Sequence, residues 1–213
     1  MRVGGAAVFW ELSIRAAAAL ILLSASGLAA GARAETTETI VFLRHGEKPA
    51  TGLGQLSCKG LNRSLALPPV IAKQFGRPDA LFAPDPSARK DDEGTLYDYV
   101  RPLATIEPTA IALGLPVNTS FGFEDIKKLQ ARLEDDVFNG STVLVAWEHK
   151  QIVKLAQHLV SAHGGDPKQV PKWGGDDFDS FYVVTIRRDA DRSSVSFART
   201  AEGLDGKADA CPF

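Results

Sequence analysis

The sequence predicts a three-layer α/β/α sandwich with a mainly parallel central sheet. Three observations lead to this prediction. Short apolar, β-branched runs have the length of strands, amphipathic segments of helical period lie between them, and turn residues separate the two kinds of segment. The composition, with 45% hydrophobic and 23% charged residues in a chain of 213, excludes a disordered, collagen-like or coiled-coil protein.

Four apolar runs are predicted to be buried strands that helices cover on both faces. They are TIVFL (39–43), ALFA (80–83), TVLVAW (142–147) and FYVVTI (181–186). A fifth run, VSFAR (195–199), follows a polar turn and is predicted to pair with 181–186 as a hairpin at the edge of the sheet.

Turn residues mark the ends of two predicted helices. The first begins after Ser57, its N-cap, and ends at Gly76, and Pro68-Pro69 should kink or interrupt it. The second has Pro102 in its first turn and Gly114 just past its end.

Two later helices are predicted from apolar residues at helical spacing. The stretch from Asp125 places on one face Ile126, Leu129, Leu133 and Val137. The stretch from Lys150 places on one face Ile152, Val153, Ala156, Leu159 and Val160.

The N-terminal 34 residues are predicted to be a signal peptide. An apolar run (16–30) follows Arg15, is shorter than the roughly 20 residues of a membrane span, and leads to Ala32-Arg33-Ala34, which suits signal-peptidase cleavage. An uncleaved N-terminal anchor is the alternative. The mature chain is then a single domain of residues 35–213, exported to a periplasm or secreted, with no stable membrane span after the signal is removed.

The charge balance argues against a nucleic-acid partner. The chain has 24 basic and 26 acidic residues, and removal of residues 1–34 takes away three arginines and one glutamate, which makes the mature chain more acidic. A protein that binds nucleic acid without sequence preference needs a strongly basic surface.

Chemically active side chains follow two of the predicted strands. Arg44, His45 and Gly46 come directly after 39–43, and Glu148 and His149 come directly after 142–147. The carboxyl ends of parallel strands are where open α/β sheets carry their sites. An arginine can orient phosphate oxygens, and a neutral histidine can attack phosphorus, so the pattern favours phosphoryl transfer.

Four segments together resemble the histidine phosphatase superfamily, also called phosphoglycerate-mutase-like. They are VFLRHGEKP (41–49), LSCKGLNRSLAL (56–67), RPLATIEPTAIALGLPV (101–117) and TVLVAWEHKQI (142–152). The resemblance implies that His45 is the nucleophile and forms a phosphohistidine, and that Arg44, Arg101 and His149 bind the phosphoryl group.

Three charged residues near these four have two possible roles each. Arg63 is either a pocket member or a structural arginine, and Glu47 and Lys48 either assist the site or serve packing and solvation.

The resemblance leaves the proton donor open. One branch of the family has an aspartate directly after the second histidine, where this chain has Lys150. Another branch takes a glutamate from the region after the third segment, which makes Glu124 the favoured donor. Asp125 and Glu148 are the alternatives.

The segment 84–102 is longer than the family's usual link. Its acidic run 91–93 is predicted to be a solvated loop, or, with Tyr97 and Tyr99, part of a flap that selects substrate. The stretch GGDDFDS (174–180) is predicted to be a turn, because it lacks the order of a calcium loop. No metal site and no cofactor are predicted.

The two cysteines, Cys58 and Cys211, are predicted to form a disulfide in an oxidising compartment, with two free buried thiols as the alternative. A cysteine-phosphatase loop from Cys58 to Arg63 is disfavoured, because it has four intervening residues instead of five and follows no strand.

The sequence thus predicts a phosphatase that acts on a phosphorylated small molecule. The alternatives are an exported protein that binds phosphate or another anionic ligand without turnover and, less favoured, a phosphomutase. Nothing in the sequence indicates the natural substrate or the oligomeric state.

Overall fold

The computed structural model describes residues 35–189 and 192–213. The strands are β1 (Thr36–Arg44), β2 (Ala80–Phe82), β3 (Lys90–Asp92), β4 (Thr95–Tyr97), β5 (Val117–Asn118), β6 (Thr142–Trp147), β7 (Ser180–Asp189) and β8 (Arg192–Ala201). The helices are α1 (Cys58–Phe75), α2 (Arg101–Leu113), α3 (Ile126–Leu133) and α4 (His149–Ala162), with 3₁₀ turns at Asp136–Phe138 and Pro167–Gln169.

The central sheet has six strands in the order β5-β2-β6-β1-β7-β8. β5, β2, β6 and β1 are mutually parallel, β7 runs antiparallel to β1, and β8 returns antiparallel to β7. The predicted strands and the edge hairpin are therefore confirmed. The parallel core is the reason why the carboxyl ends of β1 and β6 meet at one edge of the sheet.

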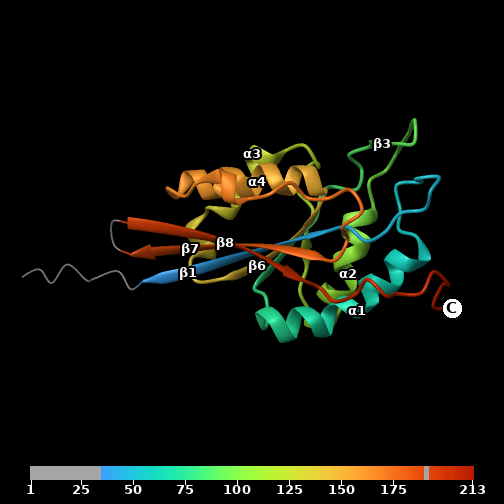
Figure 1. The fold of residues 1–213 in the computed structure, drawn as a ribbon, viewed down its shortest axis with the longest axis horizontal. Coiled ribbons are helices and arrows are strands. Elements are labelled where there is room, and N and C mark those ends of the chain that lie inside the picture. The colour runs from blue at the N-terminus through green and yellow to red at the C-terminus, as the bar shows by residue number, and fades with distance from the viewer. Residues whose placement is uncertain (1–34, 190–191) are drawn as a thin grey trace, which may run out of the picture. The chain divides into compact units, whose positions relative to one another are not determined.

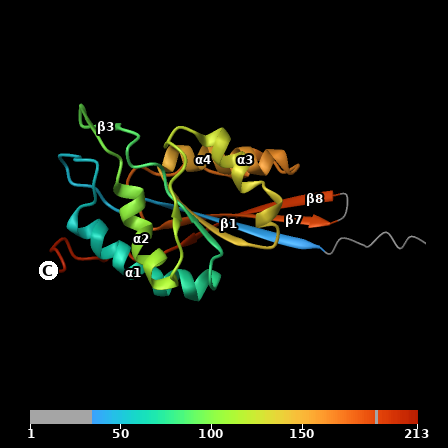
Figure 2. The same ribbon diagram turned by 180° about the vertical axis from the view of Figure 1, so that it is seen from behind.

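Helices cover both faces of the sheet (Figures 1 and 2). α3 and α4 pack on one face, where Leu129 and Leu159 join a buried cluster with Phe42 of β1. α1 and α2 pack on the other, where Leu67 and Ile106 contact a second cluster. Alternate residues of the strands supply the two clusters, as the side-chain period of two requires.

The helix that begins at Ile126 ends earlier than its apolar spacing predicts. It stops at Leu133, and Val137 lies in the following 3₁₀ turn, where it is 66% exposed. The placement of Val137 on the buried face is therefore wrong. Phe138, the next residue, enters the core instead, because the change to the tighter 3₁₀ geometry rotates the side chains relative to the α-helical face.

The first two helices have the predicted ends. The Ser57 side chain accepts a hydrogen bond from the Gly60 N–H, and Gly114 takes the left-handed conformation at the end of α2. α1 continues from Cys58 to Phe75 through Pro68 and Pro69, so the two prolines do not interrupt it.

The acidic run 91–93 belongs to a hairpin and is not simply solvated. β3 and β4 pair antiparallel, with Asp92 opposite Thr95, and the turn residues Glu93 and Gly94 both have the positive φ of a type I′ hairpin turn. Asp91 and Glu93 are exposed, whereas Asp92 is only 4% exposed. The prediction of a solvated loop is therefore wrong for Asp92.

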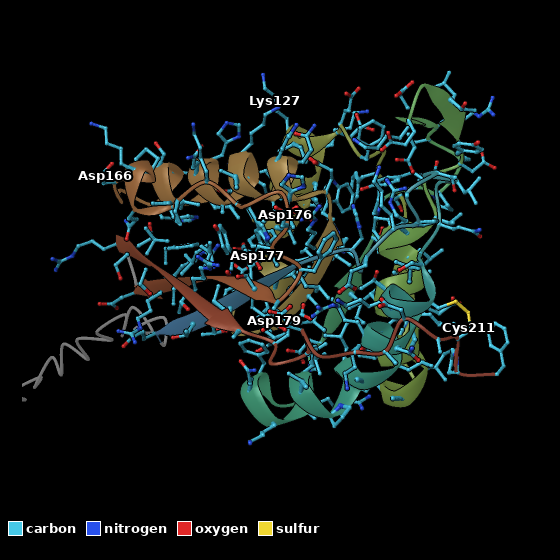
Figure 3. All side chains as sticks on the ribbon, turned by 45° about the vertical axis from the view of Figure 1, so that its right-hand side comes forward. Lys127, Asp166, Asp176, Asp177, Asp179 and Cys211 are labelled. Atoms are coloured by element: carbon cyan, nitrogen blue, oxygen red, sulfur yellow. A yellow bond between two sulfur atoms is a disulfide. The ribbon has the colours of Figure 1, made fainter. Side chains whose placement is uncertain are left out.

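A disulfide joins Cys58, the first residue of α1, to Cys211 near the C-terminus. Figure 3 shows the sulfur–sulfur bond next to Cys211. The Asn62 side chain adds two hydrogen bonds, at 2.9 and 2.7 Å, to the carbonyls of Ala208 and Ala210. The C-terminal segment is thereby fastened along the start of α1.

The predicted signal peptide and its alternative, a membrane anchor, fall on residues 1–34 and lie outside the described residues. Among the residues that the structure describes, no helix has the length and apolar character needed to span a membrane.

Candidate active site

The sheet brings the two predicted histidine segments together. Arg44 at the end of β1 is the register partner of Trp147 at the end of β6, and the backbone N–H of His45 donates to the Trp147 carbonyl at 3.2 Å. His45 and His149 both line one cavity at this edge. The structure therefore brings the ends of β1 and β6 together, as their parallel pairing requires.

His45 is held as a neutral imidazole. Its Nδ1 lies 2.8 Å from the Gly46 carbonyl oxygen, and since that oxygen can only accept, Nδ1 carries the proton and Nε2 keeps its lone pair. Burial, and then the positive charges of Arg101 and Arg44, lower the pKa of His45 to about 3. The ring is therefore uncharged at any ordinary pH.

Close backbone packing fixes the loop that carries His45. The Gly46 N–H donates to the Thr105 hydroxyl at 2.9 Å. A Cβ on Gly60 would lie 2.3 Å from the Glu47 carbonyl oxygen, so only glycine fits at this contact between α1 and the loop. The first turn of α1 thus buttresses the segment that follows β1.

Arg44 is oriented by the turn that precedes β7. Its Nη1 donates to the carbonyls of Gly174, Gly175 and Asp177, at 3.3, 2.6 and 2.9 Å, and its guanidinium stacks 3.8 Å from the centroid of the Phe178 ring. Its Nε is buried and has no hydrogen-bond partner among the described residues. The predicted turn at 174–180 therefore also positions Arg44, a role that nothing in the sequence indicated.

Arg101 begins α2 and is paired with a carboxylate that the sequence analysis did not select. Its Nη1 donates to Oδ2 of Asp92, while its buried Nε has no hydrogen-bond partner among the described residues. Asp92 also accepts from Lys48 Nζ at 2.6 Å and from the Gly54 N–H at 3.2 Å. Burial alone would raise the pKa of Asp92, but Lys48 and Arg101 hold it below its usual value.

Glu148 and His149 sit at the start of α4. Glu148 is the N-cap and accepts from the Gln151 N–H at 2.9 Å, and its Oε1 lies 3.1 Å from His149 Nδ1. Burial would raise the pKa of Glu148, but His149 and the Gln151 N–H outweigh it and lower the value to about 2. Glu148 is thus ionised, and it lines the cavity with His149 because β6 ends at Trp147.

The cavity at this site measures about 240 Å³, and every lining residue is ionisable. The lining consists of Arg44, His45, Lys48, Lys90, Asp91, Asp92, Glu93, Arg101, Glu148 and His149. Glu124, the favoured proton donor, is not among them. It is exposed and lines a separate cavity with its neighbours Asp125 and Ile126 and with Gln151, Lys154 and His158.

Arg63 is a structural arginine beneath the site. It is fully buried and donates to both oxygens of Glu47, at 3.0 and 2.9 Å, and to Asp179 at 3.1 Å and Glu202 at 2.9 Å. Figure 3 places Asp179 beside Asp177, in the turn that holds Arg44. Arg63 therefore ties the His45 loop, that turn and the C-terminal segment together.

No group of three or more histidine, cysteine, aspartate or glutamate side chains within the described ranges, 35–189 and 192–213, has the arrangement of a metal site. His158 lies in α4 and His163 just past its end, and the two histidines have different surroundings. His158 lines the cavity with Glu124, and His163 lies 3.0 Å from the Ser193 hydroxyl.

Solved structures with the same architecture exist. A mycobacterial glucosyl-3-phosphoglycerate phosphatase, native and in complex with inorganic phosphate, aligns with 76% of this chain and with 97% and 95% of its own, at a TM-score of 0.53 and 14% identity in both cases. The fold is phosphoglycerate-mutase-like. A phosphoglycerate mutase from Plasmodium falciparum also matches, with a TM-score of 0.47 and 13% identity over 78% of this chain and 92% of its own.

The phosphoglycerate-mutase-like fold confirms the resemblance noted from the four sequence segments at the level of architecture. Neither a protein-family model nor a curated protein matches the sequence.

Proposed function

We propose that this protein is a phosphatase that hydrolyses phosphate monoesters through a phosphohistidine on His45. One observation carries the proposal. A neutral imidazole lies in the same small cavity as two arginines, and each arginine keeps a buried Nε–H without a partner among the described residues. A buried donor without an acceptor is costly, and a phosphoryl oxygen would satisfy both.

The reaction divides into two steps. In the first, the lone pair of His45 Nε2 forms a bond to phosphorus while the bond from phosphorus to the ester oxygen breaks, and the alcohol leaves after taking up a proton. In the second, water attacks the phosphohistidine, the P–N bond breaks, and inorganic phosphate and neutral His45 are released. Arg44, Arg101 and His149 neutralise charge on the phosphoryl oxygens in both steps.

The Gly46 carbonyl supports this chemistry from behind the ring. Its hydrogen bond to Nδ1–H fixes the tautomer with a free Nε2, and it stabilises the positive charge that the imidazole gains on phosphorylation.

The carboxylates at the cavity are poorly suited to supply the proton for the leaving oxygen. Glu148 and Asp92 line the cavity, but the pKa of each is lowered, so both are ionised near neutral pH. Glu124 stays a prediction as the donor, and it lies at the neighbouring cavity.

Export to a periplasm or secretion is part of the proposal. The Cys58–Cys211 disulfide is compatible with an oxidising compartment, where structural disulfides persist. The same bond leaves Cys58 without a thiol, which removes the nucleophile that a cysteine-phosphatase loop would need.

The test is hydrolysis of 4-nitrophenyl phosphate from pH 4 to 8, with rapid alkaline quenching to preserve the acid-labile P–N bond. Turnover and a phosphorylated His45 peptide are expected, and His45→Ala should abolish both. Turnover that survives in His45→Ala would refute the assignment. Transfer of the phosphoryl group to an added alcohol in preference to water would identify the mutase alternative.

A second candidate is a protein that binds phosphate or another anionic ligand without turnover. The observation in its favour is the lack of a protonated carboxyl group among Glu148 and Asp92, together with Lys150 after His149. Phosphate binding by calorimetry, with neither turnover nor label on His45, would establish this candidate instead.

A further inference from the structure

The β3–β4 hairpin is anchored at the mouth of the cavity. In both ribbon views β3 lies on the side toward which β1 runs (Figures 1 and 2). Asp92 accepts hydrogen bonds from the His45 loop, through Lys48 and Gly54, and from Arg101 of α2. A buried carboxylate with three donors from two segments fixes the hairpin with respect to the reacting histidine.

Lys90 lies two residues before Asp92 on the same strand, so both side chains project from the same face of the hairpin. Both line the cavity. The Lys90 ammonium lies 4.7 Å from the centroid of the Phe123 ring and 5.6 Å from that of Tyr99, and the Tyr99 ring packs edge-on against His45 at 6.0 Å. The aromatic faces hold the ammonium beside the site without neutralising it.

The other charged side chains that line the cavity are paired, hydrogen-bonded or, like Arg44, already assigned to the phosphoryl group. Lys48 pairs with Asp92 and with Glu93, at 2.6 and 2.8 Å. Glu148 pairs with His149 and caps α4, and Asp91 accepts from the Gly94 N–H at 3.2 Å. Lys90, by contrast, makes no hydrogen bond or ion pair with any residue in the described part of the chain. Its charge reaches Glu148, whose pKa it helps to lower.

The cavity also limits the alcohol part of a substrate. Its volume of about 240 Å³ lies below the roughly 300–1,000 Å³ of common ligand sites, and none of its lining residues is apolar. Because no apolar side chain lines the cavity, a bulky aromatic or lipid group would gain little from contact with it. A small polar group would place its far end near the hairpin.

We infer that this site selects small phosphate monoesters whose alcohol part carries a second anionic group, and that Lys90 binds that group. The inference rests on the proposed phosphatase function and names its substrate class. It makes the hairpin the specificity element, with Asp92 as the residue that positions it.

Three esters of matched size test the inference: 2-phosphoglycolate, 2-hydroxyethyl phosphate and phosphoethanolamine, whose far ends are anionic, neutral and cationic. We expect kcat/KM to fall in that order, with about a 10-fold advantage of the anionic over the neutral ester, the value of one charge-assisted hydrogen bond. The exposed carboxylates Asp91 and Glu93 would favour the reverse order, so equal or better use of phosphoethanolamine would overturn the inference.

Lys90→Gln should reduce the ratio of kcat/KM between the anionic and the neutral ester by about 10-fold, through KM more than kcat. Lys154→Gln, which removes a lysine from the separate cavity, is the matched control and should leave the ratio in place. A melting curve for each variant checks folding. A ratio that Lys90→Gln does not change would overturn the assignment of Lys90.

A failure of the proposed function is distinguishable from a failure of this inference. The same three compounds are titrated by calorimetry into His45→Ala, which cannot turn over. If no ester is hydrolysed by the unmodified protein, the phosphatase proposal fails, while the order of affinities still decides the preference for a second anion. Binding of all three with equal affinity would refute that preference.

Discussion

Arg63 offers the sharpest test of how the site is held in place. Its guanidinium and the Glu202 carboxylate both have 0% side-chain exposure, and Glu47 is 13% exposed. Replacing Arg63 with methionine keeps most of the volume but leaves Glu47 and Asp179 without their cation. It also leaves Glu202, whose pKa burial raises to about 8, without its hydrogen-bond donor. Removing one partner of a buried ion pair costs about 3–5 kcal/mol, a large part of the roughly 5–15 kcal/mol that stabilises a domain.

The assay is urea unfolding at pH 7, followed by far-ultraviolet circular dichroism with the disulfide intact. Arg63→Met should lose about 3–5 kcal/mol in the free energy of unfolding. Arg89→Met is the matched control, because Arg89 is 60% exposed and its ion pair with Asp98 spans 3.6 Å, so its loss should stay below about 1 kcal/mol.

A double variant separates unpaired charge from lost packing. Arg63→Met combined with Glu202→Met removes both fully buried groups, and it should be more stable than Arg63→Met alone. The reasoning is refuted if Arg63→Met costs no more than Arg89→Met. It is also refuted if the second substitution adds its own loss, because the destabilisation would then not come from the buried carboxyl group of Glu202 left without a partner.

Three further outcomes are expected. Because Glu124 lies at the neighbouring cavity, Glu124→Gln should change kcat by only a few-fold. Without a proton donor, the unmodified protein should cleave nitrophenyl phosphate, whose leaving group needs no proton, much faster than alkyl phosphates. A loss of about 100-fold in Glu124→Gln that is confined to alkyl esters would instead establish Glu124 as the proton donor. The pKa of His45 is about 3 in the folded protein and near 6.5 in the unfolded chain, so the unfolded state binds more protons between these values. Acidification from pH 6.5 to 4 should therefore lower the free energy of unfolding by roughly 3 kcal/mol more in the unmodified protein than in His45→Gln. Equal pH dependence of the two free energies would contradict a buried neutral imidazole. The disulfide closes a sequence separation of 153 residues, so its reduction should lower the free energy of unfolding by about 5 kcal/mol in the chain-entropy model. Cys58→Ser and Cys211→Ser should have the same effect. A melting temperature that reductant does not change would show that the disulfide does not stabilise the fold.

The sequence predicts those parts of the fold that depend on local pattern. The apolar run 142–147 is a strand on its own evidence, and Pro102 and Gly114 mark the ends of α2 because their backbone preferences act within a few residues. The disulfide could be predicted from the sequence because Cys58 has a single possible partner, Cys211. The early end of α3 could not be predicted, because the apolar spacing continues to Val137 while the backbone changes to a 3₁₀ turn.

The contacts around the site depend on long separations and could not be predicted. Arg63 and Glu202 are 139 residues apart, and Arg44 and Gly175 are 131 apart. No periodicity relates such pairs, so Arg63 could have been a solvated arginine. Asp92 is closer in sequence to Arg101, but it lies within three consecutive acidic residues, which resemble a solvated run. The hairpin buries Asp92 and leaves Asp91 and Glu93 exposed, and the sequence alone does not show that difference.

The charge of the chain is a poor guide to the charge of the site. The sequence suggests positive charge concentrated at Arg44 and Arg101 against an acidic background. In the structure Arg101 is matched by Asp92, and Arg44 is surrounded by backbone carbonyls. The proposed binding of a phosphoryl group therefore rests on guanidinium N–H groups without a partner among the described residues, such as the two Nε–H groups, more than on a net positive potential. If Arg44 and Arg101 bind the phosphoryl group as proposed, Lys90 is the remaining cation at the cavity without an ion-pair partner among the described residues, and we expect the site to distinguish substrates by a second anion.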